Sequence, residues 1–295
     1  MLECLIYNNM PELPEVETIR RDLSAKIINK KFKAVAVRKP KIIRGAVASF
    51  KRRLLGRRLK NIDRVGKLLI FNLDAGLNLL IHLKMTGQLI HQKRNELTAG
   101  GHSQTGMAIT NLPNQYSHVI FTLSDNSELF FNDLRQFGYL KLTDSIRLKK
   151  IIAAFGLNPL TSAFTPSTLA ALIQNRRAPI KSILLNQNLI AGIGNIYADE
   201  SCFLAGIKPS RLASSLSARE TDALVCSIKS VLSKSIKYRG TTFNNFRDAS
   251  GRRGDFLKYL KVYKKTGQPC SLCATPVQKI KISGRGTHFC PSCQK

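Results

Sequence analysis

Apolar positions near the start of the chain recur at the spacing of a helix. Val16, Ile19, Leu23 and Ile27 lie three or four residues apart, and Pro14 suits a first helical turn. This pattern predicts a helix over residues 14–29. Short runs of β-branched and aromatic residues follow, separated by turn signals. The predicted strands are residues 32–38, 68–73, 79–83, 118–123, 129–132 and 139–142, and the polar stretch 91–117 is predicted to be a loop. Many short strands at such spacing favour a β-sandwich or barrel.

The pattern changes at residues 157–159, where Leu-Asn-Pro ends the strand-rich part. Apolar faces at helical spacing then predict helices over residues 167–174, 180–186, 196–204 and 218–238. The tail from Gly240 is rich in Gly, Lys and Arg and ends in cysteines. We therefore expect a β-rich domain over residues 10–156, a helical domain over 157–263 and a small cysteine-rich domain over 264–295.

The charge of the chain favours a protein that binds polyanions over an ordinary metabolic enzyme. Lys and Arg number 47 against 18 Asp and Glu, a formal net charge of +29. A field of this sign favours nucleic acid first and an anionic membrane surface second. No apolar run reaches the roughly 18 residues that a membrane span needs, so no membrane insertion is expected. The first residues lack the pattern of a signal peptide, which favours the cytoplasm of a cell.

Four of the seven cysteines lie close to the C-terminus in two pairs. Cys270 and Cys273 form one CxxC pair, and Cys290 and Cys293 form another sixteen residues later. This spacing is typical of a four-thiolate zinc site that is structural, because no coordination position stays open. Free thiols or a redox pair are the alternatives, and the basic residues between the pairs make them less consistent with the sequence. A hairpin turning at Ser283-Gly284 is expected between the pairs.

A second informative segment runs from residue 188 to 200. Gly192 and Gly194 permit a tight turn between two helices, and Asn195 then begins the second helix. A helix N-terminus of this kind can bind a phosphate through backbone N–H groups. Taken alone, the segment is also consistent with an ordinary helical hairpin.

Together, the opening Pro11-Glu12-Leu13-Pro14-Glu15, the segment GIGNIYADE and the cysteine hairpin resemble the bacterial formamidopyrimidine-DNA glycosylase family. The resemblance runs from Met10 to the C-terminus. Leu13 favours the branch that acts on oxidised purines, because the endonuclease VIII branch usually opens with PEGPE. The resemblance implies an α+β multidomain fold: an N-terminal helix plus β-sandwich, a helix–two-turn–helix domain and a four-Cys zinc-finger β-hairpin. It implies a base-excision repair glycosylase and AP lyase that acts on duplex DNA, and we expect a monomer associated with the nucleoid.

The resemblance also implies roles for particular residues. Pro11 matches the N-terminal proline whose amine attacks C1′ of the flipped nucleotide, and Glu12 the adjacent carboxylate. Lys67 matches a basic residue assigned to β-elimination, and Arg285 the finger arginine linked to δ-elimination. Three side chains match those that fill the space left by the flipped base: Met85, Arg135 and Phe137. Arg177, Lys181 and Asn195 match contacts to the DNA backbone, and Tyr116 stands where a DNA-contacting histidine is expected.

Two departures from the family pattern stand out. Residues 1–9 precede Met10, and an internal Pro11 has an amide nitrogen that cannot act as a nucleophile. We therefore expect the active protein to begin at Pro11. In the loop that covers the flipped base, Arg239 and Asn244 stand where the family often has glycine and a basic residue.

Other functions also fit parts of the sequence. One is an oxidised-pyrimidine glycosylase of the endonuclease VIII type, and another is a catalytically silent protein that binds damaged DNA on the same scaffold. A zinc-finger protein that binds RNA or the ribosome would explain the charge and the cysteines, but not the PELPE opening. Singly, Met85, Phe137 and Lys67 could be ordinary core or surface residues. Their joint order and spacing favour the glycosylase.

Overall fold

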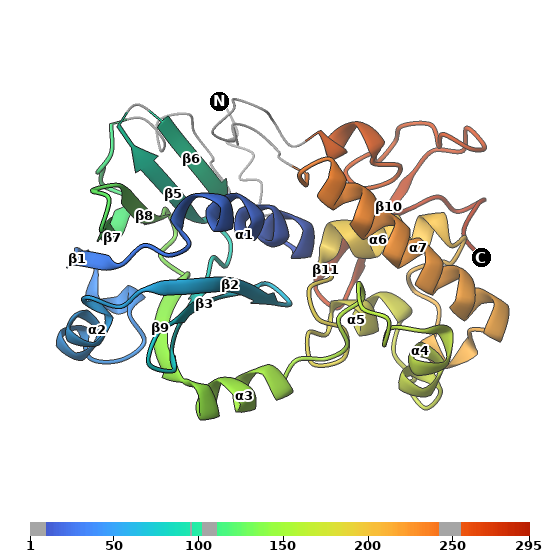
Figure 1. Ribbon diagram of the computed structural model, residues 1–295. Helices are drawn as coiled ribbons and strands as arrows, with labels where there is room; N and C mark the ends of the chain where they lie inside the picture. The colour runs from blue at the N-terminus through green and yellow to red at the C-terminus, as the bar shows by residue number, and fades with distance from the viewer. Residues whose placement is uncertain (1–9, 95, 102–110, 242–254) are drawn as a thin grey trace. The chain divides into compact units, whose positions relative to one another are not determined.

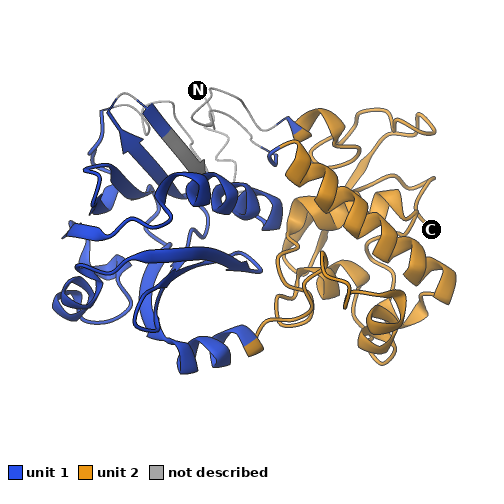
Figure 2. Cartoon of the chain, in the orientation of Figure 1, with its two compact units in different colours: residues 1–152, 239–255 blue, residues 153–238, 256–295 orange. Residues whose placement is uncertain are grey.

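The computed structural model describes residues 10–94, 96–101, 111–241 and 255–295 (Figure 1). The chain divides into two compact units. One contains residues 1–152 and 239–255, and the other contains 153–238 and 256–295 (Figure 2). Residues 1–9 and Asn244 lie outside the described residues. None of the helices in the described part of the chain has the length and apolar character that a bilayer crossing requires.

The first unit is built on two antiparallel sheets. The five-stranded sheet has the order β1-β7-β8-β5-β6, and the four-stranded sheet has the order β2-β3-β4-β9. Their strands are β1 (Phe32–Val37), β2 (Leu59–Val65), β3 (Leu68–Leu73), β4 (Leu77–His82), β5 (Gly87–Lys93), β6 (Glu96–Gly101), β7 (Ser117–Leu123), β8 (Glu128–Asp133) and β9 (Tyr139–Asp144). Because the connections β2–β3–β4 are tight, register is fixed locally by pairs such as Val65 with Leu68.

A single hydrophobic core holds the two sheets and the first helix together. Helix α1 (Leu13–Ile27) contacts β2 of one sheet and β6 of the other. Its buried stripe includes Val16, Ile19 and Leu23, as the helical spacing predicts. The helix thus carries the residues before Leu13 to a defined place on the sandwich. Short helices α2 (Val47–Leu54) and α3 (Ser145–Ala153) complete the unit.

The largest correction in this unit concerns residues 91–117. His91 lies inside β5, and β6 follows it as a paired strand, so the first part of this stretch is not a loop. The polar residues of this stretch gave no strand pattern. Backbone pairing of β5 with β6 and β8 forms strands there all the same. The predicted strands over 68–73 and 118–123 are confirmed within a residue.

Four α-helices and a hairpin are the main elements of the second unit. The helices are α4 (Pro166–Ile173), α5 (Ile180–Leu185), α6 (Asn195–Leu204) and α7 (Ala218–Lys237), close to the predicted ranges. Between α5 and α6 the side chain of Gln187 bonds three backbone groups: it donates to the carbonyls of Leu185 and Ile193 and accepts from the N–H of Gly192. Gly192 has a φ of 102°, which suits glycine. This double turn places Asn195 at the first position of α6.

The C-terminal hairpin follows the prediction closely. Strands β10 (Gln278–Ile282) and β11 (Arg285–Phe289) pair in antiparallel register. The two turn residues, Ser283 and Gly284, have φ of 47° and 77°, as a two-residue hairpin turn requires. The tail then docks on the end of α6, where Lys295 N–H donates to the Gly206 carbonyl at 2.9 Å.

Candidate active site

The start of α1 holds Pro11 and Glu12 in a buried position. Both residues are buried, and Glu12 occupies the N-cap position. Its backbone N–H donates to Glu15 Oε2 at 3.0 Å. The other oxygen of Glu15 accepts from the backbone N–H and the hydroxyl of Thr241, at 2.8 and 3.1 Å. Glu15 therefore fixes the helix start and attaches it to the segment that begins at Arg239, a role that sequence reasoning missed.

Lys67 lies in the two-residue turn of the β2–β3 hairpin and is buried. Arg64 joins this hairpin to α1, because its guanidinium donates to the Gly66 carbonyl at 2.8 Å and to Glu17 Oε2 at 3.1 Å. Burial raises the pKa of Glu17, but hydrogen bonds and charge from arginines overcome it and lower that pKa to about 2. The ion pair thus ties the Lys67 turn to the helix that Pro11 precedes.

His82 lies opposite Leu68, the residue after Lys67, on strand β4. Burial, and then the charges of Lys84 and Lys67, lower the pKa of His82 to about 3, so its ring is neutral near pH 7. Its Nδ1 accepts from the backbone N–H of Lys84 at 3.0 Å. The neutral ring therefore supports the turn that presents Met85.

Asp133 connects the two segments that carry the expected void-filling side chains, which are Met85, Arg135 and Phe137. Its carboxylate is buried and accepts from the Thr86 hydroxyl, next to Met85. It also accepts from the backbone N–H groups of Arg135 at 3.2 Å and Gly138 at 2.7 Å. The Arg135 guanidinium lies 4.8 Å from the centre of the Phe137 ring, and Phe137 is 51% exposed. A buried acid thus sets the backbone beneath Met85 and Arg135, which are half-buried, and Phe137, which is exposed.

Tyr116 is attached to the same network through its backbone. Its carbonyl accepts from the Asp133 N–H at 3.1 Å, and its own N–H donates to Asn114 Oδ1 at 3.0 Å. The side chain is half-buried. This placement leaves a contact between Tyr116 and DNA as a prediction.

In the second unit, the expected DNA-binding residues separate into two groups. Arg177 and Arg285 are exposed, and Asn195 is half-buried at the start of α6. Lys181 has no exposed surface and lies 2.6 Å from Asp199 Oδ1, so it is paired inside the protein and its contact with a phosphate stays a prediction. A lysine beside exposed arginines in the sequence looks like a surface cation, and only the fold shows that its partner comes from α6.

Glu200, the neighbour of Asp199, is a second buried acid on α6. It accepts from three consecutive backbone N–H groups, those of Lys261, Val262 and Tyr263, at 2.8–3.0 Å. Burial raises the pKa of Glu200, and the three N–H donors act against that rise. In the sequence, Glu200 is recognisable only as part of the motif GIGNIYADE. The structure shows that it binds the segment leading to the hairpin.

The four cysteines near the C-terminus form a site for one structural zinc ion. All four Sγ atoms lie within 4.8 Å of one another. Individual Sγ–Sγ distances of 3.3, 3.4 and 3.8 Å approach the edge of about 3.8 Å expected for a tetrahedron with Zn–S bonds of about 2.3 Å. Beside the site, the buried apolar cluster is small and consists of Phe203, Val262, Cys270, Val277 and Cys290. A metal therefore supplies cohesion that so few side chains do not.

Comparison with known proteins agrees with these features in each part of the chain. Residues 10–140 match the formamidopyrimidine-DNA glycosylase N-terminal domain, and residues 155–247 match the helix–two-turn–helix domain of the same enzyme. Residues 267–295 match a zinc finger found in that enzyme and in isoleucyl-tRNA synthetase. A formamidopyrimidine-DNA glycosylase of Pelotomaculum thermopropionicum is 40% identical over 97% of this chain and 99% of its own. The chain belongs to the formamidopyrimidine-DNA glycosylase family.

Solved structures of this family share the fold. A Lactococcus lactis variant bound to DNA containing Fapy-dG matches with a TM-score of 0.85 and 32% identity, over 97% of this chain and 100% of its own. A complex of MutM with DNA containing carbocyclic 8-oxo-G matches with a TM-score of 0.84 and 33% identity, over 97% and 100%. Members of the family are bifunctional glycosylases and AP lyases of base-excision repair. The predicted fold class, with its sandwich, helix–two-turn–helix and zinc finger, is confirmed.

Proposed function

We propose that this chain removes oxidised purines, 8-oxoguanine and formamidopyrimidines, from duplex DNA and then cleaves the strand. The observation that carries the proposal is the placement of Pro11 and Glu12 at the fixed, buried start of α1, with Arg64 joining the Lys67 turn to the same helix. Glu15 and Glu17 secure that arrangement. Leu13 supports the purine branch over the endonuclease VIII type.

The first chemical step uses the amine of Pro11. The Pro11 nitrogen lone pair forms a bond to C1′ while the glycosidic bond breaks, and the departing base takes up the proton that the Pro11 ammonium loses. The Glu12 carboxyl delivers a proton to O4′ as the sugar ring opens, which leaves an iminium ion on Pro11. An amine nucleophile therefore allows the lyase step that an activated water would not.

Strand cleavage follows by two eliminations. Lys67 takes a proton from C2′, and the 3′ phosphate leaves as the C2′–C3′ double bond forms. In the second elimination the C4′ proton is lost to water and the 5′ phosphate leaves as the C4′–C5′ double bond forms. Arg285 promotes this step by binding the charge of a phosphate. Arg177 and Asn195 contribute further phosphate contacts, and Tyr116 a contact from the first unit.

Base removal also requires the target nucleotide to leave the helical stack, at a cost of a few kcal/mol. The void-filling side chains Met85, Arg135 and Phe137 offset that cost by occupying the space. The exposure of Phe137 and the position of the Arg135 guanidinium over its ring support this role. The charge of +29 supports binding to duplex DNA with a steep salt dependence.

The chemistry requires Pro11 to carry a free amine, so we propose that the active protein lacks residues 1–10. We also propose that the domains end at residues 156 and 263. The protein acts as a monomer. A reducing cytoplasm, with attachment to the nucleoid through DNA, is compatible with four metal-binding thiolates.

Borohydride trapping on a duplex with one 8-oxoguanine tests the proposal. A protein beginning at Pro11 is compared with one beginning at Met1, and a duplex with an oxidised pyrimidine serves as the second substrate. We expect a covalent adduct on 8-oxoguanine with the Pro11 form only. An adduct with both forms would refute the role of the proline amine. Tight binding without any adduct would indicate a silent damage-binding protein, and a preference for the pyrimidine would indicate the endonuclease VIII type.

A further inference from the structure

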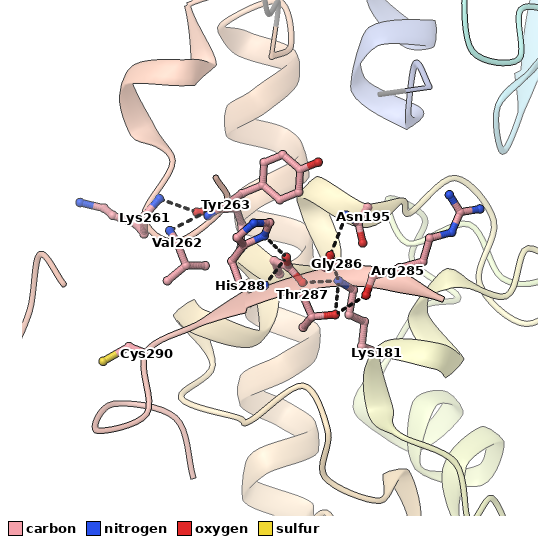
Figure 3. Close-up of polar contacts among 12 residues, drawn as sticks. Lys181, Asn195, Lys261, Val262, Tyr263, Arg285, Gly286, Thr287, His288 and Cys290 are labelled. Carbon is pink, nitrogen blue, oxygen red and sulfur yellow. Dashed lines mark hydrogen bonds and ion pairs between the residues drawn. The ribbon is translucent and has the colours of Figure 1, made fainter. Parts of the chain in front are cut away.

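Lys181 on α5 is fully buried and bonded to three groups from two other elements (Figure 3). Its Nζ lies 2.6 Å from Asp199 Oδ1 on α6. It also donates to Thr287 Oγ1 at 2.8 Å and to the Gly286 carbonyl at 3.1 Å, both on β11. One ammonium group therefore joins two helices of the second unit to the finger hairpin.

Asp199 completes the connection from its other oxygen. Oδ2 accepts from the backbone N–H of His288 at 2.9 Å and lies 3.1 Å from His288 Nδ1. Both Lys181 and Asp199 have no exposed side-chain surface. A buried charge without its partner is costly, so each of these two residues fixes the position of the other.

The Gly286 carbonyl is the point where this buried pair meets the residues that we assign to phosphate binding. It accepts from Lys181 Nζ and also from Asn195 Nδ2, at 3.0 Å (Figure 3). Arg285 precedes Gly286 in β11, and its side chain is exposed. The position of one carbonyl thus sets the orientation of the Asn195 amide and of the backbone that carries Arg285.

We propose that the Lys181–Asp199 pair is a positioning device for phosphate binding, which acts through the Gly286 carbonyl on Asn195 and Arg285. Lys181 is a positioning residue that does not touch DNA. This inference rests on the proposed function in taking Asn195 and Arg285 as phosphate-binding residues. The alternative, direct contact between Lys181 and a phosphate, would require the side chain to leave Asp199 unpaired in the interior.

Asp199 separates the two possibilities. If Lys181 acts through the pair, Lys181→Met and Asp199→Asn break the same connection and have similar effects. If Lys181 touches a phosphate, only its own replacement weakens binding. Asp199→Asn then leaves binding unchanged or tightens it, because a negative charge is removed.

The test measures the dissociation constant of the Pro11-start protein for a duplex with an abasic-site analogue, at several salt concentrations. We expect both single variants to bind roughly tenfold more weakly, the size of one lost hydrogen bond to a charged group. Lys237→Met, an exposed lysine of the same unit, is the matched control for charge. Binding by Asp199→Asn that equals or exceeds that of the unmodified protein would overturn the proposal.

A second comparison excludes a general loss of structure. In a protein that already carries Asn195→Ala and Arg285→Ala, Lys181→Met should weaken binding by much less than tenfold, because the groups it positions are gone. An undiminished loss in that background would refute positioning. The ratio of δ- to β-elimination product should fall in Lys181→Met, whereas a purely structural role would lower both products together.

Folding is checked by zinc content and circular dichroism. Should either single variant fail to fold, Lys181→Met with Asp199→Leu removes both charges, and such replacement of a buried ion pair is often tolerated. This double variant should hold one zinc ion and still bind weakly. Normal binding by it would refute the inference. Borohydride trapping with the unmodified protein tests the proposed function separately.

Discussion

Replacing Asp133 with asparagine should loosen the backbone beneath the void-filling side chains without changing their identity. The carboxylate is 1% exposed and accepts from the Thr86 hydroxyl and from the N–H groups of Arg135 and Gly138. Every one of these partners is a donor. Asp133→Asn keeps the shape of the side chain but turns one acceptor into a donor.

The magnitude follows from the two ways in which the new amide can lie. If its NH2 group faces Gly138, two donors meet and the Gly138 N–H loses its acceptor. If it faces Thr86, the hydroxyl can accept from the amide, but its own hydrogen has no acceptor. Either arrangement leaves one buried donor unsatisfied, which costs about 1–3 kcal/mol. We expect the free energy of unfolding to fall by that amount.

Activity on two substrates separates a local effect from a general one. Excision of 8-oxoguanine depends on filling the vacated space, so it should fall more than strand cleavage at a preformed abasic site. Asp125→Asn is the matched control, because Asp125 lies before the opposite end of β8 (Glu128–Asp133) and bonds Lys30 at 2.8 Å. Equal losses on both substrates, or normal stability in urea unfolding, would refute the reasoning.

Other predictions concern the metal, an ion pair and a tight turn. Removing zinc with a chelator should lower DNA affinity and the melting temperature of the second unit, and added zinc should restore both, as followed by anisotropy and calorimetry. The folded-state pKa of Glu17, about 2, lies below its ordinary value of 4.5, so its contribution to stability is present above that value and is lost as pH falls from about 4.5 to 2. The stability advantage of the unmodified protein over Glu17→Gln in urea should therefore shrink across that window. A Cβ at Gly87 would lie 2.4 Å from the Leu83 carbonyl oxygen, so Gly87→Ala should lower the unfolding free energy by about 1–3 kcal/mol and slow base excision.

Local signals in the sequence account for much of the fold. The stripe of α1, the turn at Ser283-Gly284 and the two CxxC pairs each specify a structure within a few neighbouring residues. Strand β6 and the end of β5 fall in the polar stretch 91–117 and were missed, and β5 also pairs with β8, which is distant in the chain.

The roles of the positioning residues could not be predicted from the sequence, again because their partners lie far away along the chain. Asp133 and Thr86 are 47 positions apart, and Lys181 and Thr287 are 106 apart. A lone acidic or basic residue gives no sign that it will be buried, because such burial requires a partner that only the fold supplies. Arg285 and Phe137, to which the family resemblance assigns contacts with DNA, are exposed, and those contacts stay predictions.

Acidic and basic side chains differ in how often they are buried in this protein. Among the described residues, the buried acids include Glu17, Asp133, Asp199 and Glu200, whereas Lys67 and Lys181 are the buried members of the far more numerous Lys and Arg. Buried carboxylates accept from backbone N–H groups or ion-pair partners and so fix loops and strands. The other Lys and Arg of the described residues keep some contact with solvent, where their field favours a polyanion. The buried acids of this +29 chain therefore act as structural acceptors, and each such interaction is stronger in the interior than at the surface.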